Sequence, residues 1–168
     1  ELMATEMACR ATAFDFTKER SPEANERRLF KFVSPDIQPI NQDGFEVPSN
    51  IEAIKTNIQY LHSILLSEDL ALGHPEIETT YQLFLSTWKT GQILLANPDE
   101  YTPTPSNNIP SSSWPNNNNC RGYYDWENGG RSTTLDVELR ITDDSNYVIR
   151  SWMAVMTYLL SDYRYIYE

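Results

Sequence analysis

Residues 147–160, YVIRSWMAVMTYLL, are the stretch that decides the fold. Apolar residues recur every three or four positions, which predicts a helix and not a strand. They cover two adjoining faces, so the helix should be buried against more than one neighbour. The run is interrupted by Arg150 and falls short of the ~20 residues that a membrane span needs. We therefore expect a core helix within residues 143–168, capped by Asp143, Asp144 or Ser145. Its expected buried residues are Val148, Trp152, Val155 and Leu159 on one face and Ile149, Met153, Met156, Leu160 and Tyr163 on the other.

Two further helices are predicted upstream, over about residues 49–66 and 75–96. Ser49 and Glu52 have the spacing of a capping box, which marks the start of the first. Pro75 suits the first position of the second helix. Because the connector between them is short, the two helices should form an antiparallel hairpin. Their expected buried residues are Ile51, Ile54, Ile58, Leu61 and Leu65, and Ile77, Tyr81, Phe84, Leu85 and Trp88.

The amino-terminal segment carries two shorter helix signals. Residues 2–14 are expected to be helical, with one face marked by side chains at steps of four and three. Methionines at such spacing are more often core residues than metal ligands. A second helix is predicted over residues 22–33. Pro22 suits its first helical position, and Pro35 should end it. The residues that mark the face of the first helix are Met3, Met7, Arg10 and Phe14.

The second half of the chain has a different composition. Residues 97–119 are rich in Pro, Asn and Ser and nearly free of aliphatic residues, which is typical of a connector or functional loop. Residues 135–142 alternate apolar and polar side chains, the pattern of a strand with one buried face. With the turn sequence ENGG and the segment CRGYYDW before it, they predict a β-hairpin over residues 120–142.

The fold expected from these patterns is mainly α. It is a small helical bundle, made of a helical hairpin and a carboxy-terminal core helix, with one β-hairpin and a long Pro/Asn/Ser-rich loop. A chain of 168 residues is long enough for one domain with its own core. We therefore expect a single domain, residues 1–168, with a helical part (1–96), a connector (97–119), a hairpin (120–142) and the core helix (143–168).

The charge balance excludes several partners. The chain has 24 acidic and 13 basic residues, a formal net charge of −11. Nucleic acid and anionic membrane surfaces bind through an excess of Lys and Arg, so neither is expected as a partner. No signal peptide or membrane span is recognised. Since the sequence begins at Glu1, we expect a processed or excised form of a larger secreted or periplasmic protein.

Two cysteines, Cys9 and Cys120, bear on the compartment. Their separation matches no zinc spacing, so the alternatives are one long-range disulfide or two free thiols. An acidic, Lys-poor chain rich in Asn, Tyr and Trp favours an oxidising extracytoplasmic location, where a disulfide persists. Closing a loop of this length would stabilise the fold by about 4–5 kcal/mol in the chain-entropy model.

Catalytic and metal-binding patterns are weak. His62 has no recognisable nucleophile context, and His74 precedes Pro75 in a turn, so both are expected to be structural. Phosphate-binding glycine loops and the haem attachment signature are absent from the sequence. Residues 41–44 and 142–146 are rich in oxygen ligands and leave a weak possibility of Ca²⁺, although neither matches an EF-hand loop. We predict no catalytic residue and no resident cofactor or metal.

Aromatic residues provide the remaining functional signal, because Tyr and Trp combine a large apolar face with one polar group. They suggest a non-catalytic extracytoplasmic interaction or structural module that binds a protein partner or the rest of a larger chain. A carbohydrate-binding module built on the Trp and Tyr residues around Cys120 is the first alternative. A hydrolase, or an accessory part of a redox assembly, is the second. The candidate interaction residues are Trp114, Tyr123, Tyr124, Trp126, Tyr165 and Tyr167.

Overall fold

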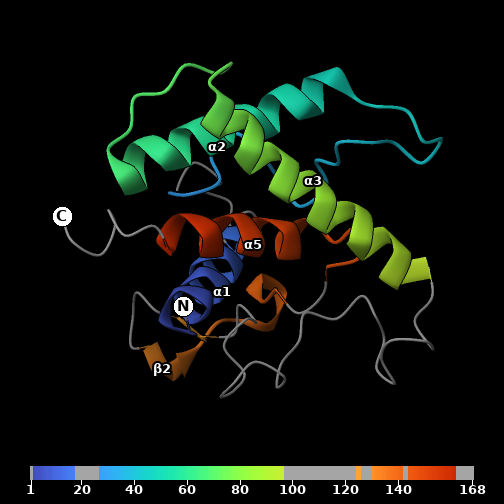
Figure 1. Ribbon diagram of the computed structural model, residues 1–168. Coiled ribbons are helices and arrows are strands. Elements are labelled where there is room, and N and C mark those ends of the chain that lie inside the picture. Colours follow the sequence, from blue (N-terminus) through green and yellow to red (C-terminus); the bar gives the residue numbers. More distant parts are fainter. Residues whose placement is uncertain (1, 18–26, 97–123, 126–129, 142–143, 162–168) are drawn as a thin grey trace.

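The computed structural model describes residues 2–17, 27–96, 124–125, 130–141 and 144–161 (Figure 1). These residues are mainly helical, as predicted: α1 is Leu2–Thr17, α2 is Pro48–Leu66, α3 is Pro75–Ala96 and α5 is Val148–Leu160. Two short strands, β1 (Tyr124–Asp125) and β2 (Gly130–Thr134), pair antiparallel, and a 3₁₀ turn, η3, covers Val137–Leu139. In Figure 1, α5 lies between α1 on one side and α2 with α3 on the other.

Helix α5 is the centre of the core, as its sequence predicts. All of its predicted core residues that the structure describes are buried except Met153, which is partly buried. Trp152 is completely buried and is flanked by the rings of Phe30 and Phe84, with centroids 5.2 and 4.8 Å away. Phe30 in turn stacks on Phe16, at 4.6 Å. This row of rings joins α1, the segment after it, α5 and α3.

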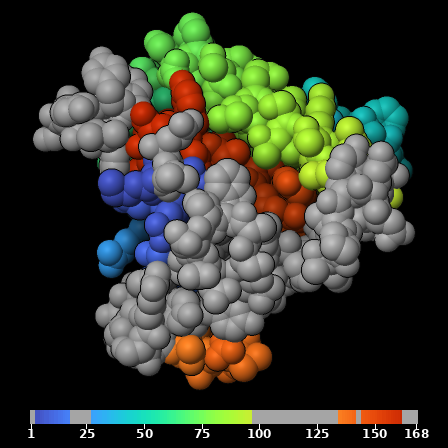
Figure 2. Space-filling model, turned by 60° about the horizontal axis from the view of Figure 1, so that its bottom comes forward, coloured from blue at the N-terminus to red at the C-terminus, as the bar shows by residue number. Residues whose placement is uncertain are grey.

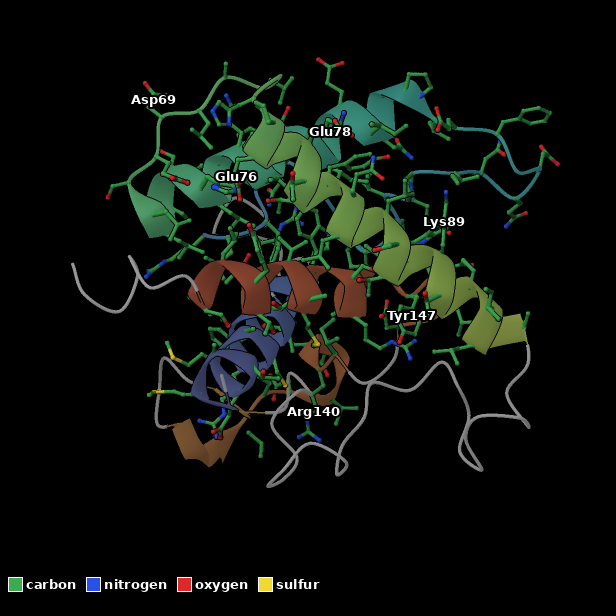
Figure 3. All side chains as sticks on the ribbon, in the orientation of Figure 1. Asp69, Glu76, Glu78, Lys89, Arg140 and Tyr147 are labelled. Atoms are coloured by element: carbon green, nitrogen blue, oxygen red, sulfur yellow. The ribbon has the colours of Figure 1, made fainter. Side chains whose placement is uncertain are left out.

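Polar contacts fix the start of α5. The N-cap residue of α5 is Tyr147, which makes no side-chain cap. Asp144, three residues earlier, accepts hydrogen bonds from the backbone N–H groups of Ile149 and Arg150 and so caps the first turn from outside the helix. The Arg150 guanidinium bonds to Asp144 and lies 3.8 Å from the ring centroid of Tyr147. Tyr147 has a φ of 58° and packs on Gly91 of α3, where a Cβ atom would lie 2.0 Å from its ring (Figure 3). Only glycine leaves room for this ring.

Helix α1 corrects the prediction for its buried face. Met3 is 72% exposed and Met7 is 40% exposed. The buried side chains are mostly small, and small side chains let two helix backbones come close. Helix α5, the most extensive partner of α1, adjoins it on the face drawn in Figure 2. The buried residues of α1 are Ala4, Ala8, Cys9, Thr12, Ala13, Asp15, Phe16 and Thr17.

The helical hairpin forms with a different start from the one predicted. Helices α2 and α3 pack together; in Figure 1 they cross obliquely, with α2 running towards the left of the view and α3 back towards the lower right. The capping box at Ser49 and Glu52 is not formed: α2 begins at Pro48, and its N-cap, Val47, makes no side-chain cap. The proline supplies a preset φ at the first helical position, so the helix starts two residues earlier than it would with Ser49 as the N-cap.

The predicted helix over residues 22–33 is wrong for residues 27–33, the part that the structure describes. The backbone N–H groups of Arg28, Leu29 and Phe30 donate to the carboxylate of Asp15 in α1, at 2.8, 3.1 and 2.9 Å. Because these donors are committed to another element, they are not available for a helical ladder. We call residues 27–33 the presented loop.

The predicted strand over residues 135–142 is also wrong for residues 135–141, the part that the structure describes. Hydrogen bonds from the N–H of Leu139 to Asp136 O and from Arg140 to Val137 O close the η3 turn instead. Val137 is 73% exposed, and Ile141 alone of the alternating apolar residues is fully buried. The hairpin predicted over residues 120–142 is therefore not observed in that form; the paired strands β1 and β2 end at Thr134. The predicted connector, 97–119, lies outside the described residues.

Candidate functional site

A carboxylate, an imidazole and a hydroxyl meet where α2 ends and α3 begins. His62 Nδ1 lies 2.8 Å from Glu68 Oε2, and His62 Nε2 lies 3.1 Å from Thr80 Oγ1. This is the order of groups in a hydrolase triad, in which the carboxylate orients the imidazole and the imidazole activates the hydroxyl. The sequence reasoning did not foresee the grouping, because its members come from a helix, a loop and another helix.

Burial of this constellation opposes a catalytic role. Thr80 is completely buried and His62 is 1% exposed, so a substrate carbonyl cannot reach the hydroxyl. Thr80 Oγ1 also lies 2.9 Å from the carbonyl oxygen of Glu76, one turn back in the same helix. The three side chains join α2, the connector and α3, which agrees with the structural role predicted for His62. His74 accepts a hydrogen bond from the N–H of Glu76 and so caps α3.

A charged cluster also joins the two helices of the hairpin. Lys55 Nζ lies 2.5 Å from Glu78 Oε2 and 4.7 Å from the ring centroid of Tyr81. Hydrogen bonds from Lys55 and Gln82 lower the pKa of Glu78. Burial raises the pKa of Tyr81, and the carboxylates of Glu46 and Glu78 raise it further. Figure 3 shows Glu76 and Glu78 in the first turns of α3. The lowered pKa of Glu78 suits an ion pair, not a general acid.

In the two segments considered for Ca²⁺, Asn41 and Asp144 use their side-chain oxygen atoms for local structure. Asn41 Oδ1 accepts hydrogen bonds from the N–H groups of Asp43 and Phe45, and Gly44 adopts a φ of 86°, as a tight turn requires. Asp144 caps α5, as described above. Across the described residues, no group of three or more His, Cys, Asp or Glu side chains is arranged to hold a metal ion.

The presented loop is held from inside the molecule. In addition to the three N–H groups bound by Asp15, the Phe32 N–H donates to Asn57 Oδ1, and Asn57 Nδ2 donates to Leu29 O. Asp15 and Asn57 are 6% and 0% exposed. The backbone of the loop is thus fixed by two buried polar side chains, one from α1 and one from α2.

On its outer side, the presented loop displays cationic and aromatic groups. Phe32 is 50% exposed, and its ring meets that of Tyr60 edge to face, 5.8 Å between centroids. Lys31 Nζ lies 4.8 Å from the Tyr60 ring centroid, and the Tyr60 hydroxyl donates to Arg28 O. Ile64, one turn after Tyr60 on α2, is 43% exposed. We call this surface the basic aromatic patch; it comprises Arg28, Lys31, Phe32, Tyr60 and Ile64.

An apolar pocket of about 350 Å³ opens between α1, α5, the end of α2 and the presented loop. Methionines lie on two of its walls, and among the described lining residues Arg10 carries a positive charge. The pocket lies close to the basic aromatic patch, because Leu29 and Leu65 of its lining are the chain neighbours of Arg28 and Ile64 of the patch. We call it the methionine pocket; its described lining is Met7, Arg10, Ala11, Phe14, Leu29, Leu65, Met156 and Leu160.

Most interaction residues predicted from the sequence cannot be placed. Trp114, Tyr123, Trp126, Tyr165 and Tyr167 lie outside the described residues. The backbone of Tyr124 pairs with Thr134 in the short β1–β2 ladder. Cys9 is buried in α1 and Cys120 lies outside the described residues, so the disulfide stays a prediction. No helix in the described part of the chain has the length and apolarity needed to cross a membrane.

Comparisons with known proteins give no further guide to the site. Searches against protein-family models, curated proteins and solved structures found no match. The function therefore has to be argued from the chemistry of the described surfaces alone.

The basic aromatic patch was missed by sequence reasoning, although a signal was present. Residues 27–32, RRLFKF, place three basic residues and two phenylalanines in six positions of an otherwise acidic chain. The segment was predicted to be a helix, without any assignment of its exposed side chains; in the observed loop conformation Phe32 is exposed.

Proposed function

We propose that the chain is a non-catalytic interaction module that binds a protein partner through the basic aromatic patch. It would act as a subunit, or as a segment of a larger extracytoplasmic protein or assembly. The observation that carries the proposal is the half-exposed Phe32 on a backbone fixed by Asp15 and Asn57. A side chain displayed on a rigid backbone loses little conformational entropy on binding, which is a property of interface hot spots.

The alternatives have less support. A hydrolase built on His62 would need a substrate to reach the Thr80 hydroxyl, and Thr80 is completely buried. The carbohydrate hypothesis was based on tryptophans that lie outside the described residues. In the patch, the exposed Phe32 ring and the partly buried Tyr60 ring are inclined at 78°, so this pair offers no flat platform for a sugar ring. A protein side chain, in contrast, packs well into an edge-to-face pair.

Photo-crosslinking in the cells that make the protein tests the proposal. A photoreactive phenylalanine analogue would replace Phe32 or Ile64 in the patch, or the exposed Phe45 or Ile93 elsewhere. We expect one discrete adduct, identified by mass spectrometry, whose yield falls when an excess of unlabelled chain is added. A diffuse set of adducts that no excess chain suppresses, at all four positions, would refute an interaction module.

The extracytoplasmic location is part of the proposal and is supported by the acidic balance and by the pair of cysteines. We expect Cys9 and Cys120 to be bridged in native material. Peptide mapping by mass spectrometry under non-reducing conditions would then find the two cysteine peptides joined, and reduction would separate them. Alkylation of both thiols without prior reduction would contradict the bridge and remove the main support for this location.

A further inference from the structure

We infer that the partner presents an acidic segment with one large apolar, preferably aromatic, side chain, which enters the methionine pocket while its carboxylates pair with Arg28 and Lys31. This inference rests on the proposed function and specifies the chemistry of the partner. It is carried by the nearness of two features, an apolar pocket and an exposed cationic pair, Arg28 and Lys31, on the loop that supplies Leu29 to the pocket.

The pocket supplies the site for the apolar anchor. Its volume of about 350 Å³ is sufficient for a large side chain and part of its backbone. Met7 and Met156 lie on walls formed by different helices. Methionine side chains adapt to irregular shapes, and their sulfur atoms make favourable contacts with aromatic rings. An aromatic anchor therefore fits this lining better than a branched aliphatic one.

The charge of the surroundings selects an acidic segment. Arg28 and Lys31 are both exposed, three positions apart on the presented loop. Arg10 lines the pocket itself and is bonded to Glu6, so the stronger attraction comes from Arg28 and Lys31. Within a chain of net charge −11, a local cationic surface favours anionic groups that contact this surface alone. Charges beyond about 8 Å are largely screened at physiological ionic strength, so a short segment is little repelled by the rest of the chain.

An anionic membrane fits these observations less well. A membrane is an extended charged plane, so it would meet acidic parts of the surface along with the patch, and the net repulsion would oppose binding. A peptide segment needs to contact only the patch and the pocket. An extended segment of about six residues spans roughly 20 Å, enough to reach from the pocket onto the patch.

Amide NMR titration of the full chain tests the inference. The probe is a short capped peptide in which glutamates flank a leucine–phenylalanine pair; its twin has lysines in place of the glutamates. We expect the glutamate peptide to shift the amide signals of Leu29, Phe32 and Ile64, and the lysine peptide to shift none of them. Vesicles containing phosphatidylserine serve as a second probe and should not bind.

Three variants, each with a matched control, assign the contacts. Phe32→Ala and Met7→Asp should each weaken binding by about thirtyfold, the effect of losing an interface hot spot. Lys31→Glu should weaken it by a similar factor and reduce its dependence on salt. All three residues are exposed, so the substitutions leave the core intact. The controls Phe45→Ala, Met3→Asp and Lys89→Glu change the same residue types outside the pocket and the patch, and should leave the affinity unchanged.

The outcomes separate this inference from the proposed function. Equal binding of the two peptides, binding of vesicles in place of the peptide, or equal effects of variants and controls would overturn the acidic anchor. If crosslinking nevertheless gave a discrete partner, the interaction module would stand with a different partner chemistry. If crosslinking gave no partner either, both proposals would fail.

Discussion

Replacing Asp15 with asparagine tests how the presented loop is held. In the wild-type chain, Oδ1 accepts one backbone N–H and Oδ2 accepts two. Asparagine has nearly the same shape, but it carries no charge and one of its two terminal atoms is a donor. At least one N–H of the loop would therefore face the NH₂ group and lose its acceptor. The other N–H groups would keep an acceptor, but a neutral amide oxygen in place of a charged carboxylate oxygen.

The expected cost follows from this count. A hydrogen bond to a charged group contributes about 1.5–3 kcal/mol and a neutral one about 0.5–1.5 kcal/mol. One lost bond at about 2 kcal/mol and two weakened bonds at about 0.5 kcal/mol each give a destabilisation of about 3 kcal/mol. Asp15 is 6% exposed, so water can replace little of this loss.

Urea unfolding, followed by circular dichroism, is the assay. With a slope of about 2 kcal/mol/M, a loss of about 3 kcal/mol lowers the midpoint by about 1.5 M. The matched control is Asp36→Asn, because Asp36 is exposed and, among the described residues, its carboxylate accepts one long hydrogen bond, 3.5 Å from Asn146 Nδ2. We expect this control to change stability by less than about 0.5 kcal/mol. Equal midpoints for the two variants would refute the account of the loop, as would unchanged hydrogen exchange at the amides of Arg28, Leu29 and Phe30.

Two further predictions concern the hairpin and its contact with α5. Gly91→Ala should destabilise the fold by about 1–3 kcal/mol in thermal or urea unfolding, because the new methyl group would overlap the Tyr147 ring. Gly73→Ala, which meets nothing within 4 Å, should be nearly neutral, and a Gly91→Ala variant as stable as that control would contradict the packing. Lys55→Gln should raise the pKa of Glu78, measured by NMR titration, towards its ordinary value, whereas Lys55→Arg should keep it low. Because the folded-state pKa of Glu78 is lowered, the stabilisation from the Lys55–Glu78 pair is present above the ordinary pKa and is lost as the pH falls through the folded-state pKa. An unchanged pKa of Glu78 in Lys55→Gln would show that the pair does not form in solution.

The parts of the fold that were predictable are those encoded by local periodicity. The apolar faces of α5, α2 and α3 repeat at helical spacing, and burial follows that pattern closely from Val148 to Leu160. Pro75 and the acidic residues after it likewise mark the start of α3 from local chemistry alone.

The parts that were missed depend on contacts distant in the sequence. The presented loop is defined by Asp15 and Asn57, and Asn57 lies 25 residues from Phe32. In α1 the closeness of α5 favours small residues over methionines at the interface, which hydrophobicity alone does not reveal. Alternation over residues 135–142 predicts a strand, but the turn at Val137 prevails. The candidate site was missed for the same reason, since exposure of Phe32 depends on that loop.

Asp15 and Asn57 bind the backbone of the presented loop, and this has an evolutionary consequence. Both buried side chains form their hydrogen bonds with backbone groups of the loop, so these bonds do not depend on which side chains occupy positions 28, 31 and 32. Mutation could therefore change the residue types at these three exposed positions, and with them the partner that is bound, while the backbone conformation of the loop is kept. A scaffold of this kind can acquire new recognition properties without passing through unfolded intermediates.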